Sequence, residues 1–170
     1  MTVENPSAER FIVFLRHGTA EDPNGKTDAE RNLTPEGHAE MKQISRGLEE
    51  VLSKADTVIA SPLVRAQQTA VWVTKAYRLR VKVETSEALA PGASPEDFLA
   101  LLAATPGRRV ICVGHEPTLT NHMRALVRGS LSNLGLQTGG AYGVRMAADG
   151  SARLEWVLTP KILRKLGEAD

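Results

Sequence analysis

The sequence has little of several features that mark whole classes of protein. It contains a single cysteine, Cys112, which excludes a secreted scaffold held by internal disulfides. No apolar run approaches the roughly 18 residues of a membrane span, and the polar, acid-containing start does not resemble a signal peptide. Neither sign of charge dominates, because 21 Lys and Arg stand against 20 Asp and Glu. This balance argues against bulk electrostatic binding to nucleic acid or to membranes, and we expect a cytoplasmic protein.

The chain also lacks internal repeats, low-complexity tracts and long linkers. Its 170 residues suffice to bury a core without disulfides or metals, so we expect a single domain over residues 1–170. Three short apolar runs, at 11–15, 57–60 and 110–113, are rich in β-forming residues. This pattern is typical of strands buried on both faces, as in a parallel sheet covered by helices.

Helix signals alternate with these strands. A hydroxyl residue followed by proline predicts three helix starts, at Thr34-Pro35, Ser61-Pro62 and Ser94-Pro95. The first helix should reach about residue 52 and the second about 77. The third should stop near Pro106-Gly107, and a fourth should span about 117–128. Further expected elements are a short strand at 81–83, a hairpin of 142–146 with 154–158 around Asp149-Gly150, and a short basic amphipathic helix at 161–166. The predicted class is a three-layer α/β/α fold with a mainly parallel central sheet.

Polar motifs follow each of the three apolar strands directly. Arg16-His17-Gly18 follows the first, Ser61 to Arg65 follows the second, and Gly114-His115-Glu116 follows the third. In an open α/β sheet, ligands bind beyond the carboxyl ends of the strands. If the strands are parallel neighbours, the two arginines and the two histidines converge on one crevice.

Such a set of side chains suits a compact dianion. Arginine matches phosphate oxygens in bidentate pairs, and the first turn of a helix also favours an anion. A neutral histidine can act as a covalent nucleophile, and neighbouring cations lower its pKa and keep it neutral. Taken singly, Arg16, His17 and Arg65 could each be an ordinary surface or turn residue; only their joint placement indicates a phosphate-handling site.

At these motifs the chain resembles the histidine phosphatase (phosphoglycerate mutase-like) superfamily, and within it the SixA-type phosphohistidine phosphatases. The resemblance rests on three motifs in order and extends over nearly the whole chain, from Phe11 to about Pro160: LRHG at 15–18, SPLVRAQQTA at 61–70 and VGHEP at 113–117. It implies a phosphoglycerate mutase-like fold and a metal-independent hydrolase without a cofactor. His17 would be the nucleophile that carries the phosphoryl group, and Arg16, Arg65 and His115 would hold its oxygens. Gly18 and Thr19 would complete the substrate-binding surface.

The leaving group separates the subclasses. Alcohol phosphates need a carboxylic acid as proton donor, whereas phosphohistidine releases imidazole, whose conjugate acid has a pKa of about 6.5. Glu87 is the one acid we nominate as a general acid. Only about 30 residues separate the helix after Ser61 from the strand at Val110, whereas mutases of this superfamily have a much longer insertion there that covers the pocket. We therefore expect the crevice to be open to a histidine on a folded protein.

The first hypothesis is therefore a phosphatase that acts on phosphohistidine in a phosphotransfer domain or phosphocarrier protein. The first alternative is a phosphomonoesterase or mutase for a small phosphate ester, which requires a working acid such as Glu87. The second is a phosphate- or phosphoprotein-binding module without catalysis, which the presence of all four site residues disfavours.

The chain departs from the family pattern at Thr19, since many relatives have Glu or Asp directly after the RHG motif. Two further residues are expected to have structural roles. Glu116 is expected to cap the following helix rather than to flank the site. Cys112 is expected to be a small buried hydrophobe, and because no HExxH pattern accompanies His115 or His122, we expect no metal site.

Overall fold

The computed structural model describes residues 9–78, 83–129 and 131–168. Within these residues the chain forms one six-stranded sheet of order β3-β2-β4-β1-β5-β6. β3, β2, β4 and β1 run parallel, while β5 is antiparallel to both β1 and β6. The strands are β1 (Arg10–Arg16), β2 (Thr57–Ala60), β3 (Glu84–Thr85), β4 (Arg109–Gly114), β5 (Ala141–Met146) and β6 (Ala152–Leu158).

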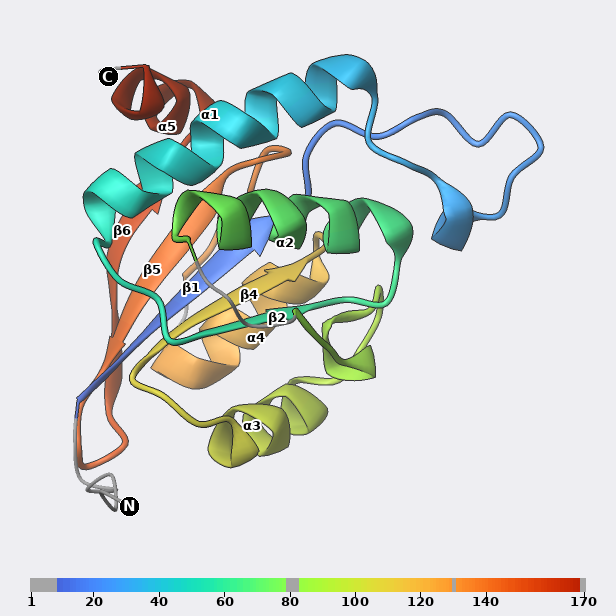
Figure 1. Ribbon diagram of the computed structural model, residues 1–170. Helices are drawn as coiled ribbons and strands as arrows, with labels where there is room; N and C mark the ends of the chain where they lie inside the picture. The colour runs from blue at the N-terminus through green and yellow to red at the C-terminus, as the bar shows by residue number, and fades with distance from the viewer. Residues whose placement is uncertain (1–8, 79–82, 130, 169–170) are drawn as a thin grey trace.

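Helices cover both faces of the sheet (Figure 1). One layer contains α1 (Pro35–Val51), α2 (Val64–Ala76) and α5 (Pro160–Gly167), and the other contains α3 (Pro95–Ala104) and α4 (Thr118–Val127). Two 3-10 turns are present, η1 (Asp28–Glu30) and η2 (Glu87–Leu89). The predicted three-layer, mainly parallel α/β class is confirmed. None of the helices among the described residues has the length and apolar character needed to cross a membrane.

Alternation along β1 explains the two core layers. Val13 and Leu15 pack into the cluster under α1, α2 and α5, while Ile12 and Phe14 pack into the cluster under α3 and α4. All four are fully buried, as expected for a strand covered on both faces. Cys112 lies in the second cluster, where burial raises the pKa of its thiol to about 12, so it is the small buried hydrophobe that we expected.

The hydroxyl-proline signal is correct at two of its three positions. The Thr34 and Ser94 side chains accept hydrogen bonds from the backbone N–H of Gly37 and Asp97 and begin α1 and α3. The expected start at Ser61-Pro62 is wrong, since α2 begins at Val64. The Ser61 hydroxyl instead accepts from the backbone N–H of Leu63 and contacts His115.

The remaining expectations agree in outline. β5 and β6 form the predicted hairpin, and Gly150 in its turn has a φ of +81°, which favours glycine. α5 is the predicted short helix and packs along α1. Residues 81 and 82 of the strand expected at 81–83 lie outside the described residues, and the short strand β3 follows at 84–85.

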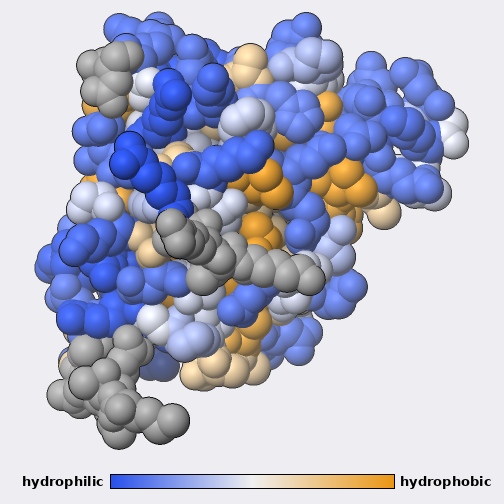
Figure 2. All heavy atoms as spheres, viewed as in Figure 1, coloured by the Kyte–Doolittle hydropathy of each residue, from blue (hydrophilic) through white to orange (hydrophobic). Residues whose placement is uncertain are grey.

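The strand order positions the site. β2, β4 and β1 are adjacent and parallel, so their carboxyl ends meet at one edge of the sheet. Arg16 at the end of β1 is in register with Gly114 at the end of β4. After β1 the chain forms a segment, residues 20–33, that projects beyond the sheet and is largely hydrophilic (Figures 1 and 2). The end of this segment returns to the same sheet edge, where Gln68 of α2 binds the backbone N–H of Leu33.

Candidate active site

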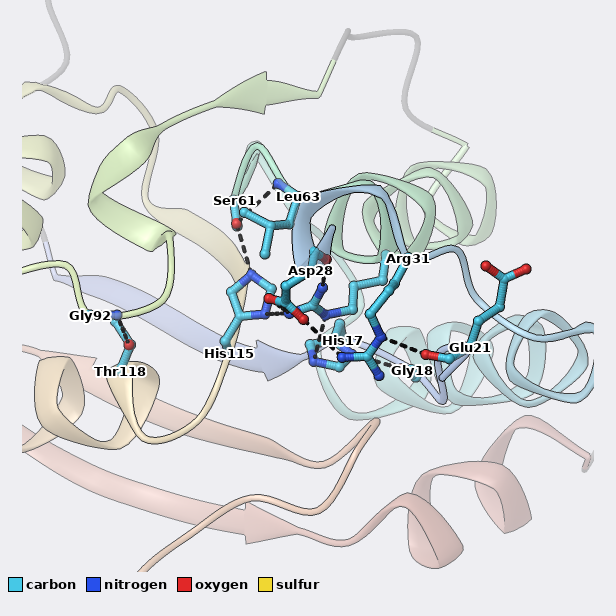
Figure 3. Close-up of polar contacts among 11 residues, drawn as sticks. His17, Gly18, Glu21, Asp28, Arg31, Ser61, Leu63, Gly92, His115 and Thr118 are labelled. Atoms are coloured by element: carbon cyan, nitrogen blue, oxygen red, sulfur yellow. Dashed lines mark hydrogen bonds and ion pairs between the residues drawn. The ribbon is translucent and has the colours of Figure 1, made fainter. Parts of the chain in front are cut away.

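Side chains from the three predicted motifs converge at this sheet edge (Figure 3). Arg16 and His17 come from the end of β1, Arg65 from the first turn of α2, and His115 from the residue after β4. The rings of His17 and His115 lie 5.0 Å apart between centroids. They border a cavity of about 390 Å³ that is lined by Arg16, His17, Thr19, Ala20, Asp28, Arg31, Arg65, Pro91, His115, Glu116 and Thr138.

The hydrogen bonds of His17 define its tautomer. Its Nδ1 lies 2.7 Å from the carbonyl oxygen of Gly18, which can only accept, so Nδ1 carries the proton and donates it. Its Nε2 accepts from Nε of Arg65 at 3.2 Å and therefore carries the lone pair. Burial, reinforced by the charges of Arg65 and Arg16, lowers the pKa of His17 to about 4. His17 is thus a neutral imidazole at physiological pH, and the lone pair on its Nε2 lies beside the cationic Arg65.

His115 is fixed by the same reasoning. Its Nδ1 lies 3.3 Å from Nη2 of Arg65, which can only donate, and its Nε2 lies 2.8 Å from the Ser61 hydroxyl. The proton is therefore on Nε2, which donates to Ser61. Burial and the proximity of His17 and Arg65 lower the pKa of His115 to about 3. An arriving dianion would raise this pKa and favour a second proton on Nδ1.

Arg65 is almost fully buried and connects the site to the projecting segment. Its Nη1 donates to the backbone carbonyl of Asp28 at 2.6 Å, and its Nη2 donates to the Asp28 carboxylate at 2.9 Å. Arg31 binds the other carboxylate oxygen at 2.8 Å. Hydrogen bonds from Arg65 and Arg31 lower the pKa of Asp28, which is therefore ionised at neutral pH.

Arg16 retains a donor for a ligand. Its Nη1 donates to the backbone carbonyl of Leu136 at 2.5 Å. Its Nε is buried and has no hydrogen-bond partner among the described residues. A buried donor without a partner is costly in a folded protein, so the position favours an acceptor from outside the chain.

Gly18 and Thr19 have different surroundings. The Gly18 N–H donates to Thr69 of α2 at 3.1 Å, so Gly18 fixes the turn after β1 rather than lining the cavity. A Cβ at Gly18 would also crowd Met41 and Leu33. Thr19 lines the cavity, and its hydroxyl donates to Glu40 at 3.2 Å.

The two acids considered in the sequence analysis lie in different places. Glu87 is exposed at the start of η2, and the structure does not bring it among the residues that line the cavity. Glu116 does line the cavity. Its expected role as a helix cap is wrong, because its Oε1 accepts from the Thr120 hydroxyl at 2.8 Å and from the backbone N–H of Leu136 at 2.9 Å.

Sequence reasoning missed Asp28 and Arg31 and gave Ser61 another role. Asp28 and Arg31 reach the site from an irregular segment with no periodic pattern, so the local sequence pattern assigns neither residue a place in the site. Ser61 was expected to cap a helix, but its hydroxyl binds His115 and α2 begins three residues later, at Val64.

Comparison with known proteins decides the family. Residues 12–90 match the model of the histidine phosphatase superfamily, branch 1. An uncharacterized protein of Picosynechococcus sp. is 32% identical over 149 residues, which cover 85% of this chain and 88% of that protein. The chain belongs to the histidine phosphatase superfamily.

Solved structures of this superfamily are similar over their whole length. The protein histidine phosphatase SixA, solved with tungstate, superposes with a TM-score of 0.79 at 24% identity. The match covers 90% of this chain and 99% of the SixA chain. A protein from Agrobacterium tumefaciens assigned as a SixA phosphohistidine phosphatase gives a TM-score of 0.75 at 25% identity, covering 89% of this chain and 98% of its own. The SixA-type resemblance and the phosphatase class expected from the sequence are therefore confirmed.

Proposed function

We propose that the protein is a metal-independent phosphohistidine phosphatase. The observation that carries the proposal is the tautomer of His17, whose Nε2 holds a lone pair among Arg16, Arg65 and His115. In the proposed first step this nitrogen attacks the phosphorus atom, the bond between phosphorus and the substrate nitrogen breaks, and the imidazole departs with that electron pair. In the second step water attacks the phospho-His17 intermediate, which releases inorganic phosphate and restores the neutral ring.

Positive charge at the site supports both steps. The transferring phosphoryl group carries charge on its equatorial oxygens, and donors that are already in place stabilise that charge without reorganisation. The free Nε of Arg16 and the charged guanidinium of Arg65 are such groups, and His115 adds a donor when the arriving dianion favours a proton on its Nδ1. They supply the neutralisation for which other phosphatases use a metal ion.

The acids around the cavity favour a nitrogen leaving group. Asp28 is held ionised by two arginines, and Oε1 of Glu116 already accepts two hydrogen bonds. Glu87 lies outside the cavity lining. The imidazole of a phosphohistidine needs no separate proton donor in order to depart when its other ring nitrogen is protonated, because it then leaves as neutral imidazole. The expected substrate is therefore a histidine-phosphorylated protein, such as a phosphotransfer domain or phosphocarrier.

The test is phosphate release from a histidine-phosphorylated carrier protein, measured beside a panel of phosphate monoesters and in the presence of a chelator. We expect rapid release from the carrier alone, a loss of roughly three orders of magnitude or more in His17→Ala, and little change in His38→Ala, the matched control on α1. Alkaline quenching should trap phosphate on the wild-type chain and not on His17→Ala.

Other outcomes point to the alternatives. Preference for a small ester, combined with collapse of activity in Glu87→Gln, would identify a metabolite phosphatase. Absence of both turnover and trapped phosphate would identify a binding module. Wild-type turnover in His17→Ala would overturn the mechanism.

A further inference from the structure

An irregular segment between α4 and β5, residues 131–140, contacts the two residues at the end of β1. The backbone N–H of Gly139 donates to the carbonyl oxygens of Arg16 and His17 at 3.2 and 3.1 Å, and the carbonyl of Gly140 accepts from the N–H of Arg16 at 3.0 Å. The carbonyl of Leu136 accepts from Nη1 of Arg16. The placement of the Arg16 guanidinium therefore depends on how this segment is held.

Glu116 holds the segment from the opposite side. Leu136 binds both residues through its backbone. Its carbonyl accepts from Nη1 of Arg16, and its N–H donates to Oε1 of Glu116 at 2.9 Å. That oxygen also accepts from the hydroxyl of Thr120, which contacts the Tyr142 hydroxyl at 2.9 Å. Thr120 and Tyr142 are buried, so the carboxylate is anchored to α4 and β5.

We propose that Glu116 is a positioning residue that orients Arg16 through the backbone of Leu136. This inference rests on the proposed function, because it assigns Arg16 to a phosphoryl oxygen. Arg16 lines the cavity, and fixing Nη1 on the Leu136 carbonyl sets the orientation of its guanidinium, whose Nε has no hydrogen-bond partner among the described residues. Without the tether, the Leu136 carbonyl and the guanidinium bound to it would shift together.

The charge of Glu116 works against phosphate binding. Glu116 lines the same cavity as Arg16 and His17, so its carboxylate repels a dianion placed there. The role that we assign needs only an acceptor at Oε1, and a glutamine carbonyl supplies one at the same reach. Geometry and charge can therefore be separated by substitution.

The experiment measures the dissociation constant for inorganic phosphate by calorimetry and the steady-state kinetics of the proposed substrate in four variants. Glu116→Ala removes the tether, Glu116→Asp keeps the charge but shortens the reach, and Glu116→Gln keeps the reach without the charge. Glu155→Ala is the control, because it removes a hydrogen-bonded carboxylate on β6. Circular dichroism verifies that each variant is folded.

We expect Glu116→Ala and Glu116→Asp to raise the dissociation constant and KM about tenfold, the equivalent of about 1.4 kcal/mol, with a smaller effect on kcat. Glu116→Gln should bind phosphate at least as tightly as the wild type. Wild-type affinity in Glu116→Ala, or equal weakening in Glu116→Gln and Glu116→Ala, would overturn the inference. Normal phosphate binding with a collapsed kcat in Glu116→Gln would assign the carboxylate to proton transfer instead.

Phosphate affinity is measured without turnover, so the two proposals can fail separately. If phosphohistidine is not the substrate but phosphate binds and responds to Glu116 as described, only the proposed function fails. If the wild-type protein binds no phosphate, the inference about Glu116 fails, while the proposed function is still decided by turnover and by trapping of phosphate on His17.

Discussion

The guanidinium of Arg65 holds three parts of the site together. Its Nε donates to His17, its Nη2 to His115 and to Asp28, and its Nη1 to the Asp28 backbone. These donors point in fixed directions within one plane, and a lysine ammonium offers the same charge from a single point. The site therefore depends on the shape of this side chain as well as on its charge.

Arg65→Lys should weaken phosphate binding and kcat/KM by about 100-fold although the charge is kept, because two lost hydrogen bonds of about 1.4 kcal/mol each amount to about 2.7 kcal/mol. Calorimetry with phosphate and steady-state kinetics measure the two effects. Arg153→Lys on β6, whose arginine contacts Glu155 at the surface, is the matched control. Equal behaviour of the two lysine variants would show that charge alone suffices at Arg65.

At the scale of elements, α1 and α5 cross closely through two glycines. A Cβ at Gly47 would overlap the backbone carbonyl oxygen of Leu163, and one at Gly167 would overlap that of Gln43. The backbones therefore approach to a distance that only glycine permits. α5 in this way packs beside α1 in the same layer, and its Leu163 joins the hydrophobic cluster between this layer and the sheet.

Gly47→Ala should lower the free energy of unfolding by about 1–3 kcal/mol, because the overlap with backbone outweighs the better helix propensity of alanine. Urea denaturation followed by circular dichroism measures the loss. Gly135→Ala is the control, since a Cβ there meets nothing within 4 Å, and its effect should stay within about 0.5 kcal/mol. A Gly47→Ala protein as stable as the control would contradict this account of the crossing.

The elements also show which local signals can be trusted. The caps at Thr34 and Ser94 were predictable because each side chain serves its own helix. The same signal at Ser61 gave a wrong helix start, because the Ser61 hydroxyl accepts a hydrogen bond from His115, a residue 54 positions away. Likewise, the convergence of His17, Arg65 and His115 could be predicted from the strand ends. Asp28 and Leu136 could not, because irregular segments reach the site through long-range contacts that no local pattern encodes.

At the scale of the whole molecule, the two histidines make stability depend on pH. Their pKa values are lowered from 6.5 to about 4 for His17 and about 3 for His115 in the folded protein. Below pH 6.5 the unfolded chain binds protons that the folded chain does not, so stability falls as the pH falls. The loss attributable to His17 ends near pH 4, where the folded protein also takes up the proton.

His17→Asn should therefore flatten the pH dependence between pH 6.5 and 4, by up to about 1.4 kcal/mol per pH unit. Urea denaturation of wild type and variant at several pH values in this window gives the two slopes. The comparison removes the contribution of the carboxylates, which both proteins share. Parallel slopes would mean that His17 titrates normally in the folded state.

The register between β1 and β4 has a consequence for how such an enzyme can change its substrate. Because Arg16 pairs with Gly114, the separation of the next residues, the proposed nucleophile His17 and His115, follows the spacing of neighbouring strands, about 4.8 Å. Segments 20–33 and 83–94 approach the cavity from outside this frame. Segment 83–94 can be lengthened, shortened or replaced to recognise a different leaving group, whereas segment 20–33 must keep Asp28, which holds Arg65 beside the two histidines. The sheet fixes the spacing of the two histidines, so the segment that contacts the leaving group can change without moving them.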